Sequence, residues 1–257
     1  MRRMRRVGRF VGGTIVALAT IGVIVGFVVA VLLTPLWVFG EQDRAGSAAL
    51  TGYTAAEVRV ATGAILGDMI VGPPDFDVTI RDQAVLNEAE RTHLRDVRSN
   101  FLAFFAVIAI CLVILVLARW RSHGSVTFWR GVRVGSAILA VSVAALAGFA
   151  VVAFGLLFET FHQLLFPPGT YTFDPLTDRL VQLFPERFWF DTAIVLALGL
   201  MLCGLTIRTL AGRRLKALRA ASVEATTGED RTQDREAVPP TPPSADASSS
   251  DPTPAGT

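Results

Sequence analysis

The sequence predicts an all-α membrane protein with four transmembrane helices, a small extracytoplasmic cap and both termini in the cytoplasm. Of its 257 residues, 52% are hydrophobic, and they gather in four blocks that contain no charged residue. A helix needs about 20 consecutive, mostly apolar residues to cross the hydrocarbon core of a bilayer. The segments between the blocks differ in charge, and this difference predicts which of them face the cytoplasm.

The first predicted transmembrane helix covers residues 11–39, inside the uncharged block at residues 10–40. Five arginines and no acidic residue precede it, as at the basic start of a secretory signal peptide. The apolar run is much longer than the roughly 7–15 residues of a signal-peptide core, so we expect the helix to be retained. Gly22 and Gly26 form a G-x-x-x-G pair within it, which allows another helix to approach closely.

The outer segment at residues 40–98 is predicted to be a small ordered cap. Thr54, with Glu57 three residues later, has the sequence of a capping box at the start of an apolar-periodic helix. Residues 76–80 alternate between apolar and polar, which predicts a short strand. Residues 82–101 are predicted to form a polar helix that continues into the second transmembrane helix.

Three further transmembrane helices are predicted at about residues 99–118, 132–158 and 190–207. The outer segment between the last two, residues 159–189, is rich in aromatic residues. Nine of the 33 residues at 158–190 are aromatic and four are prolines, whereas aromatic residues make up 9% of the whole chain. Because aromatic side chains collect at the headgroup level of a membrane, we expect a hairpin or a partly re-entrant segment at the outer interface.

Charge predicts the orientation. The N-terminus, residues 119–133 and residues 208–219 contain arginine or lysine and no acidic residue, so they should lie in the cytoplasm. Residues 40–100 contain six arginines against ten acidic residues, and residues 159–191 contain two against five, so both should lie outside. A topology of four helices with both termini inside agrees with the charge of every segment.

The predicted membrane domain covers residues 1–215. Residues 216–257 are rich in Pro, Ser, Asp and Thr toward their end and are predicted to form a disordered cytoplasmic tail. Both cysteines, Cys111 and Cys203, fall in apolar blocks, so no disulfide framework is expected outside. The net charge of +2 is the sum of basic cytoplasmic segments and acidic outer segments. It therefore gives no reason to expect a nucleic-acid partner.

Two histidines, His93 and His162, are the strongest candidates for chemistry, because the topology places both at the outer ends of helices. Asp96 follows His93 by three residues, and Glu159 precedes His162 by three. Side chains at this spacing share one face of a helix. A carboxylate that accepts a hydrogen bond from one ring nitrogen fixes the tautomer and leaves the other nitrogen free to act as a base.

Several function classes remain open on the residues alone. The sequence has no G-x-S-x-G, no H-E-x-x-H and no cysteine in an outer segment, which disfavours a covalent serine or cysteine hydrolase. A reaction in which the substrate supplies its own nucleophile needs only a base and an oxyanion stabiliser. The alternatives are a metal-dependent membrane hydrolase, an acyl transfer with a different donor, and a non-catalytic structural or accessory protein of the cell envelope.

Two segments resemble the signature regions of the lipoprotein intramolecular transacylases (Lit), a family of four-helix bacterial membrane proteins. They are ERTHLRDVR at residues 90–98 and FETFHQLLFPPGTYTFDPLTDRLVQLFPERFWFD at residues 158–191. The resemblance in topology covers residues 1 to about 215. The residues that match the family motifs are Glu90, His93, Leu94, Asp96, Val97, Phe161, His162, Leu164, Phe166, Pro167, Phe173, Asp174, Pro175, Leu183, Phe184, Pro185, Glu186, Phe188 and Asp191.

The resemblance implies an acyltransferase of the bacterial cytoplasmic membrane whose active face is extracytoplasmic. It would move the sn-2 acyl chain of a diacylglyceryl-cysteine lipoprotein to the α-amine of that cysteine, giving an N-acyl lyso-lipoprotein. The expected partners are membrane lipids and diacylated lipoproteins, with no cofactor and no metal. His93 and His162 would be catalytic and Asp96 and Glu159 would orient them. Candidate donors to an oxyanion or a lipid headgroup are Arg95, Arg98, Tyr171 and Trp189.

Overall fold

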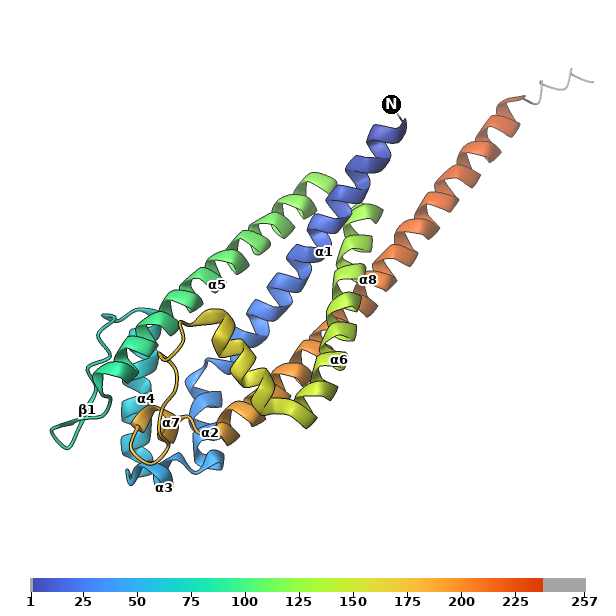
Figure 1. The fold of residues 1–257 in the computed structure, drawn as a ribbon. Helices are drawn as coiled ribbons and strands as arrows, with labels where there is room; N and C mark the ends of the chain where they lie inside the picture. The colour runs from blue at the N-terminus through green and yellow to red at the C-terminus, as the bar shows by residue number, and fades with distance from the viewer. Residues whose placement is uncertain (1, 238–257) are drawn as a thin grey trace, which may run out of the picture. The chain divides into compact units, whose positions relative to one another are not determined.

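The computed structural model describes residues 2–237, which are mainly helical (Figure 1). Within residues 2–237, four helices are long and apolar enough to cross a membrane, as predicted. They are α1 (Arg2–Leu32), α5 (Glu88–Ser122), α6 (Val126–Leu165) and α8 (Glu186–Ala237). The chain up to Leu215 forms one compact unit, and a second unit begins at Lys216 within α8.

Helix α1 ends at Leu32, earlier than the predicted end at residue 39. The chain breaks there because Pro35 disfavours a helical conformation in the residue before it, and Thr34 is accordingly extended, with φ −69° and ψ 145°. Helix α2 (Pro35–Ala45) then starts with Pro35 in its first turn. The membrane-spanning part of α1 is Phe10–Leu32.

The predicted cap forms one small apolar core. Helices α3 (Ser47–Thr51), α4 (Ala55–Ile70) and α7 (Arg179–Leu183) pack with α2 and with the start of α5. The capping box that Thr54 and Glu57 predict is present at the start of α4. The fully buried side chains of this core include Ile65, Phe76 and Leu183.

The segment before α5 differs from the predicted helix at residues 82–101. Strands β1 (Thr79–Ile80) and β2 (Gln83–Ala84) form a two-stranded antiparallel hairpin. Arg81 and Asp82 join them with φ of 52° and 61°, the positive values that a tight two-residue hairpin turn requires. Helix α5 begins only at Glu88, because Asn87 and Glu90 form a capping box there.

Helix α6 is longer than predicted and changes direction at Ala153, where φ is −136° and ψ is 44°. Its apolar span is Val126–Ala150, and a shorter apolar stretch, Val152–Leu165, follows the kink. Figure 1 shows this second stretch turning back toward α5. The reversal that the sequence predicts within residues 158–190 therefore starts earlier, inside the third long helix.

Helix α1 packs closely against both α5 and α6. A Cβ atom added to Gly22 would lie 2.8 Å from the Sγ of Cys111, and one added to Gly26 would overlap Ile108. The G-x-x-x-G pair thus allows the close approach of α5. On the other side, a Cβ at Gly135 of α6 would overlap the backbone of α1, a contact that we did not predict.

Helix α8 extends beyond its predicted range of residues 190–207 in both directions. It begins at Glu186, directly after Pro185, and it continues through Ala237. Residues 216–237, predicted as the start of a disordered tail, are helical, and the sequence has no proline between Pro185 and Pro239 to end the helix. The rest of the predicted tail lies outside the described residues.

Candidate active site

The two histidines come together at the cap end of the four-helix unit. His93 lies in the second turn of α5, and His162 lies in the last turn of α6, which the kink at Ala153 brings back to α5. Their ring centroids are 6.2 Å apart and their planes are inclined by 23°. The predicted topology placed both histidines at the outer ends of helices, on the same side of the membrane, and the structure brings the two rings together.

The site lies outside the uncharged part of α5. With 35 residues, α5 is about 50 Å long, whereas the hydrocarbon core of a bilayer is about 30 Å thick. The uncharged residues 99–118 are sufficient to cross it. The preceding turns of α5, residues 88–98, hold all of its acidic side chains and pack against the cap.

His93 is buried among aromatic rings. Its imidazole centroid lies 4.7 Å from that of Phe166 and 5.5 Å from that of Phe173, and the residue is 7% exposed. This burial, with a smaller contribution from His162, lowers the pKa of His93 to about 4. His93 is therefore uncharged at neutral pH. Its Nδ1 atom has no hydrogen-bond partner among the described residues.

His162 is held in one tautomer by the backbone of its own helix. Its Nδ1 lies 2.8 Å from the carbonyl oxygen of Phe158. Because a carbonyl only accepts hydrogen bonds, Nδ1 bears the proton in this contact. The Nε2 lone pair of the neutral ring is then available as a base. The rings of Phe158 and Tyr171 pack against the imidazole, with centroids 4.2 Å and 5.2 Å away.

The two carboxylates do not make the predicted hydrogen bonds to the histidines. Glu159 accepts hydrogen bonds from the hydroxyl of Tyr171, at 3.0 Å, and from Nε2 of Gln163, at 2.9 Å. Within the described part of the chain, Asp96 has no hydrogen bond to His93, although its charge favours the protonated form of that ring. The carbonyl of Phe158 occupies the position that we expected a carboxylate to take.

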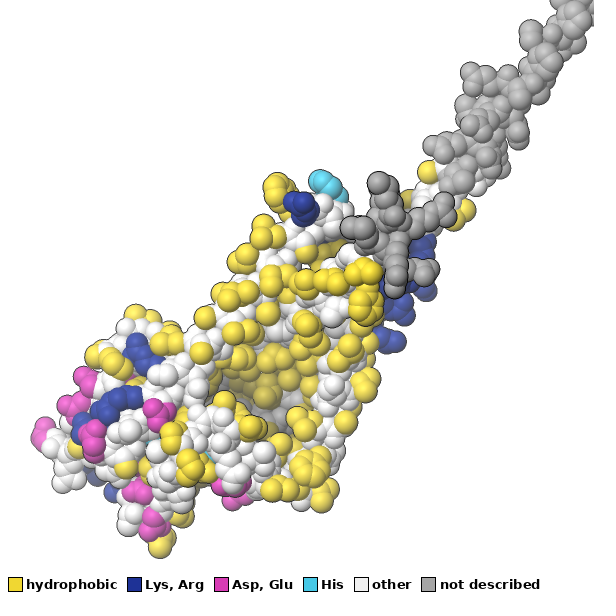
Figure 2. Space-filling model, turned by 45° about the horizontal axis from the view of Figure 1, so that its top comes forward, with side chains coloured by type: hydrophobic (Ala, Val, Ile, Leu, Met, Phe, Trp, Pro, Cys, Tyr) yellow, Lys and Arg dark blue, Asp and Glu magenta, His cyan; other side chains and the backbone are white. Residues whose placement is uncertain are grey.

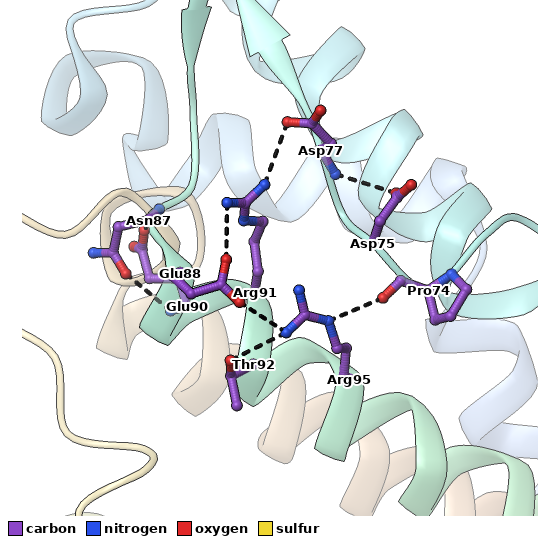
Figure 3. Close-up of polar contacts among 9 residues, drawn as sticks. All are labelled: Pro74, Asp75, Asp77, Asn87, Glu88, Glu90, Arg91, Thr92 and Arg95. Atoms are coloured by element: carbon purple, nitrogen blue, oxygen red, sulfur yellow. Dashed lines mark hydrogen bonds and ion pairs between the residues drawn. The ribbon is translucent and has the colours of Figure 1, made fainter.

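The two candidate arginines bind the cap. Arg95 donates to the carbonyl of Pro74 at 3.2 Å and to the carboxylate of Glu88 at 3.0 Å, as Figure 3 shows. Arg98 donates to the carbonyl oxygens of Asp68 and Gly72 at the end of α4. These contacts hold α4 and the following loop against α5, and they give neither arginine a contact with the imidazoles.

Of the other two candidate donors, only Tyr171 contacts a histidine. Trp189 packs against Phe158, which in turn packs against His162. The ring centroid of Trp189 is 6.3 Å from that of Phe158 and 5.2 Å from that of Phe188, and the residue is 42% exposed. Burial raises the pKa of Tyr171, and its hydrogen bond to Glu159 acts in the same direction. The tyrosine hydroxyl therefore stays protonated at neutral pH.

Two polar residues that we did not predict as site residues position the histidine-bearing elements. Glu90 is buried, and its carboxylate accepts from the backbone N–H of Asn87 at 2.7 Å and from that of Leu180 in α7 at 2.6 Å. The amide of Asn100, two turns after His93, donates to the carbonyl of Leu165 at 3.2 Å. Asn100 thus connects α5 to the end of α6.

The arrangement brings together an imidazole with an available Nε2 and a second, buried imidazole that is neutral at neutral pH, both lined by aromatic rings. In residues 2–237, the rings of Phe and Tyr side chains surround the two imidazoles. No group of three or more His, Cys, Asp or Glu side chains within these residues is arranged to hold a metal ion.

Most of the chain matches a protein-family model. The model of the family described as "Lipoprotein intramolecular transacylase Lit" matches residues 14–189. An uncharacterised protein of Aquifex aeolicus is 27% identical over 123 residues, which are 47% of this chain and 53% of the relative. The chain therefore spans about half the length of this curated relative.

Three solved structures of one protein have the same fold. The membrane-integral lipoprotein intramolecular transacylase Lit of Bacillus cereus matches with a TM-score of 0.69 and 18% identity, over 83% of this chain and 98% of that one. Two forms of it with a substituted histidine match with a TM-score of 0.68 and 18% identity. They cover 86% and 85% of this chain, and 97% and 98% of their own chains.

Proposed function

The chain belongs to the lipoprotein intramolecular transacylase (Lit) family of membrane-integral enzymes, and from this premise we propose that it converts diacylated lipoproteins into N-acyl lyso-lipoproteins. The sn-2 acyl chain of the diacylglyceryl-cysteine would move to the α-amine of the same cysteine. The observation that carries the proposal is the pair formed by His93 and His162, one buried and one with a free Nε2.

The proposed reaction needs no protein nucleophile. The α-amine attacks the carbonyl carbon of the sn-2 ester, and a tetrahedral intermediate with a negatively charged oxygen forms. The bond from that carbon to the glyceryl oxygen then breaks, which leaves an amide and a free hydroxyl. Because the amine and the ester belong to one molecule, holding them in the right geometry supplies much of the acceleration.

His162 is suited to move the proton. Its Nε2 accepts a proton from the attacking amine and then delivers it to the glyceryl oxygen as that oxygen leaves. The free α-amine has a pKa near 7.7–8.0, so a base that removes its proton makes it a nucleophile near neutral pH. The Nδ1 contact with Phe158 keeps the ring oriented during both steps.

His93 is suited to stabilise the oxyanion. A neutral imidazole has one N–H group, and a buried donor aimed at the developing charge acts in a low-dielectric surrounding. The lowered pKa keeps this ring uncharged at neutral pH, so it would stabilise the oxyanion as a hydrogen-bond donor and not as a cation. Phe166 and Phe173 exclude water from it.

The proposed orientation places the cap outside the cytoplasm. Basic residues without acidic ones flank the helix ends opposite the cap, which favours the cytoplasm for that side. Lipoproteins would then meet the histidine pair at the outer interface of a bacterial cytoplasmic membrane.

The test is mass spectrometry of the N-terminal lipopeptide of one defined lipoprotein in a host without other N-acyltransferases. We expect the N-acyl lyso form with the intact protein and its loss with His93→Ala or His162→Ala at equal expression. His123→Ala is the control, because His123 lies in the loop between α5 and α6, away from the cap. An unchanged diacylglyceryl-cysteine with well-expressed intact protein would contradict the proposal for that substrate.

A further inference from the structure

Helices α1 and α6 diverge as they approach the cap (Figure 1). Nearer the N-terminus, Gly135 of α6 lies against the backbone of α1, and Ile24 of α1 belongs to the same apolar cluster as Leu139 of α6. Val28 and Leu32 continue the face of Ile24 and stay buried in that cluster, and Phe27 and Val31 lie beside them on α1. Both of these side chains are nevertheless largely exposed, at 61% and 48%.

The corresponding row of α6 is also left open. Leu146 lies seven residues after Leu139 on the same face, and it is 55% exposed. Its neighbour one turn on, Phe149, is 48% exposed. Figure 2 shows a hollow lined by hydrophobic side chains on this face of the molecule, between α5 and α6. We call the open space between the exposed Phe27 and Val31 of α1 and the exposed Leu146 and Phe149 of α6 the basin.

The histidine-bearing stretch of α6 forms the cap-side edge of the basin. After the kink at Ala153, residues 152–165 run back toward α5, and Asn100 binds the last carbonyl of that stretch (Figure 1). His162 lies in the same stretch, so the base and the edge of the basin belong to one helical segment. The spans around the basin, residues 10–40, 99–118 and 134–158, contain no charged side chain.

We propose that the basin binds the hydrocarbon tail of the sn-2 acyl chain while its ester lies at the histidines. This inference rests on the proposed function and specifies where that function holds its substrate. Three features favour an acyl chain over other occupants: the basin is apolar, it lies between membrane-spanning helices, and one edge of it carries the proposed base. An acyl chain placed there keeps its tail out of water and its ester at the apolar boundary near His162.

The basin should therefore select for chain length. Helix α6 rises about 10 Å between Leu146 and the kink, so Leu146 lies far along the path of the chain from the ester. Leu146→Trp adds volume at that distant position, where a long chain meets it and a short one does not. Val141→Trp is the matched control, because Val141 is 71% exposed and lies five residues from Leu146, about 140° around the same helix.

The experiment measures transacylation by the full chain in lipid nanodiscs, with lipopeptides that have either palmitoyl or octanoyl at sn-2. We expect Leu146→Trp to lower kcat/KM for the palmitoyl substrate about tenfold while the octanoyl substrate changes less than about twofold. Val141→Trp should alter neither. An unchanged ratio in a Leu146→Trp protein of normal Tm would overturn the proposal, and failure of the wild type on both substrates would contradict the proposed function instead.

A second measurement is independent of turnover. A lipopeptide with a photoreactive diazirine near the end of its sn-2 chain is crosslinked to the protein in the same nanodiscs, and the labelled peptides are identified. We expect labels on the faces of α1 and α6 that contain Phe27 and Leu146. Labels that are equally frequent around Val141, or that vanish with excess phospholipid, would show contact with bulk lipid alone and overturn the proposal.

Discussion

The imidazole rings of His93 and His162 lie 6.2 Å apart, centroid to centroid, although they come from opposite ends of two different helices. No hydrogen bond joins the two rings within the described structure. His162 instead binds the carbonyl of its own helix, and His93 packs against phenylalanines. In the proposed reaction each imidazole would act on the substrate by itself, so substitutions of the two histidines should have different effects.

Substitution of His162 should remove the proton transfer. We expect His162→Ala to lower kcat on a defined diacylglyceryl lipopeptide by roughly 10²–10⁴-fold, the usual contribution of a positioned general base. His93→Gln should retain more activity than His93→Ala, because the glutamine amide still offers an N–H donor to the oxyanion. Product formation is followed by mass spectrometry at saturating substrate. Equal activity of the two His93 variants would contradict a donor role for that ring.

Acid should destabilise the protein through His93. The folded-state pKa of His93, about 4, is below its ordinary value of 6.5, so the unfolded chain binds this proton more readily than the folded one. The stability of the fold should then decrease as the pH falls from about 6.5 to about 4, and it should be fully present above that window. Thermal unfolding in detergent measures this, with His93→Gln as the reference. A Tm that falls equally with pH in both proteins would contradict the prediction that protonation of His93 causes the loss of stability.

The sequence predicted the membrane-spanning helices well because their cause is local. Uncharged blocks such as residues 99–118 are long enough to cross a bilayer, whatever they pack against. The capping box of Thr54 and Glu57 is likewise complete within four residues, and the structure contains it. These features need no knowledge of distant parts of the chain.

The features that the sequence did not predict depend on tertiary contacts or on competing local patterns. Ala153 lies in an apolar run with no proline nearby, so nothing in that run indicates the change of direction in α6. Pairing each histidine with an acid three residues away used helical spacing alone, and the spacing did not show that Glu159 binds Tyr171. The predicted helix start at residue 82 is wrong because the capping box of Asn87 and Glu90 starts α5 at Glu88.

Tyr171 should support His162 mainly through its ring. The two ring centroids are 5.2 Å apart, whereas the tyrosine hydroxyl is engaged with Glu159. We expect Tyr171→Phe to keep kcat/KM within about threefold of wild type and Tyr171→Ala to lower it about tenfold through lost packing. A loss of about 10²-fold or more in Tyr171→Phe would instead identify the hydroxyl as an oxyanion donor.

Glu90 should be required for stability where its neighbour Glu88 is not. Glu90 is 1% exposed and accepts from two backbone N–H groups, so Glu90→Ala leaves both donors without this partner inside the cap. Leaving a buried donor unsatisfied costs about 1–3 kcal/mol, and we expect Glu90→Ala to lower the free energy of unfolding by about 2 kcal/mol or more.

Glu88→Ala is the matched control for Glu90, two residues away on the same helix. The side chain of Glu88 is 67% exposed and pairs with Arg91 and Arg95 on the surface of the cap (Figure 3). Exposed ion pairs contribute at most about 1 kcal/mol, so this variant should stay close to wild type. Thermal unfolding of both variants in the same detergent measures the difference. Similar Tm values for the two would show that the bonds of Glu90 to Asn87 and Leu180 do not hold α7 against α5.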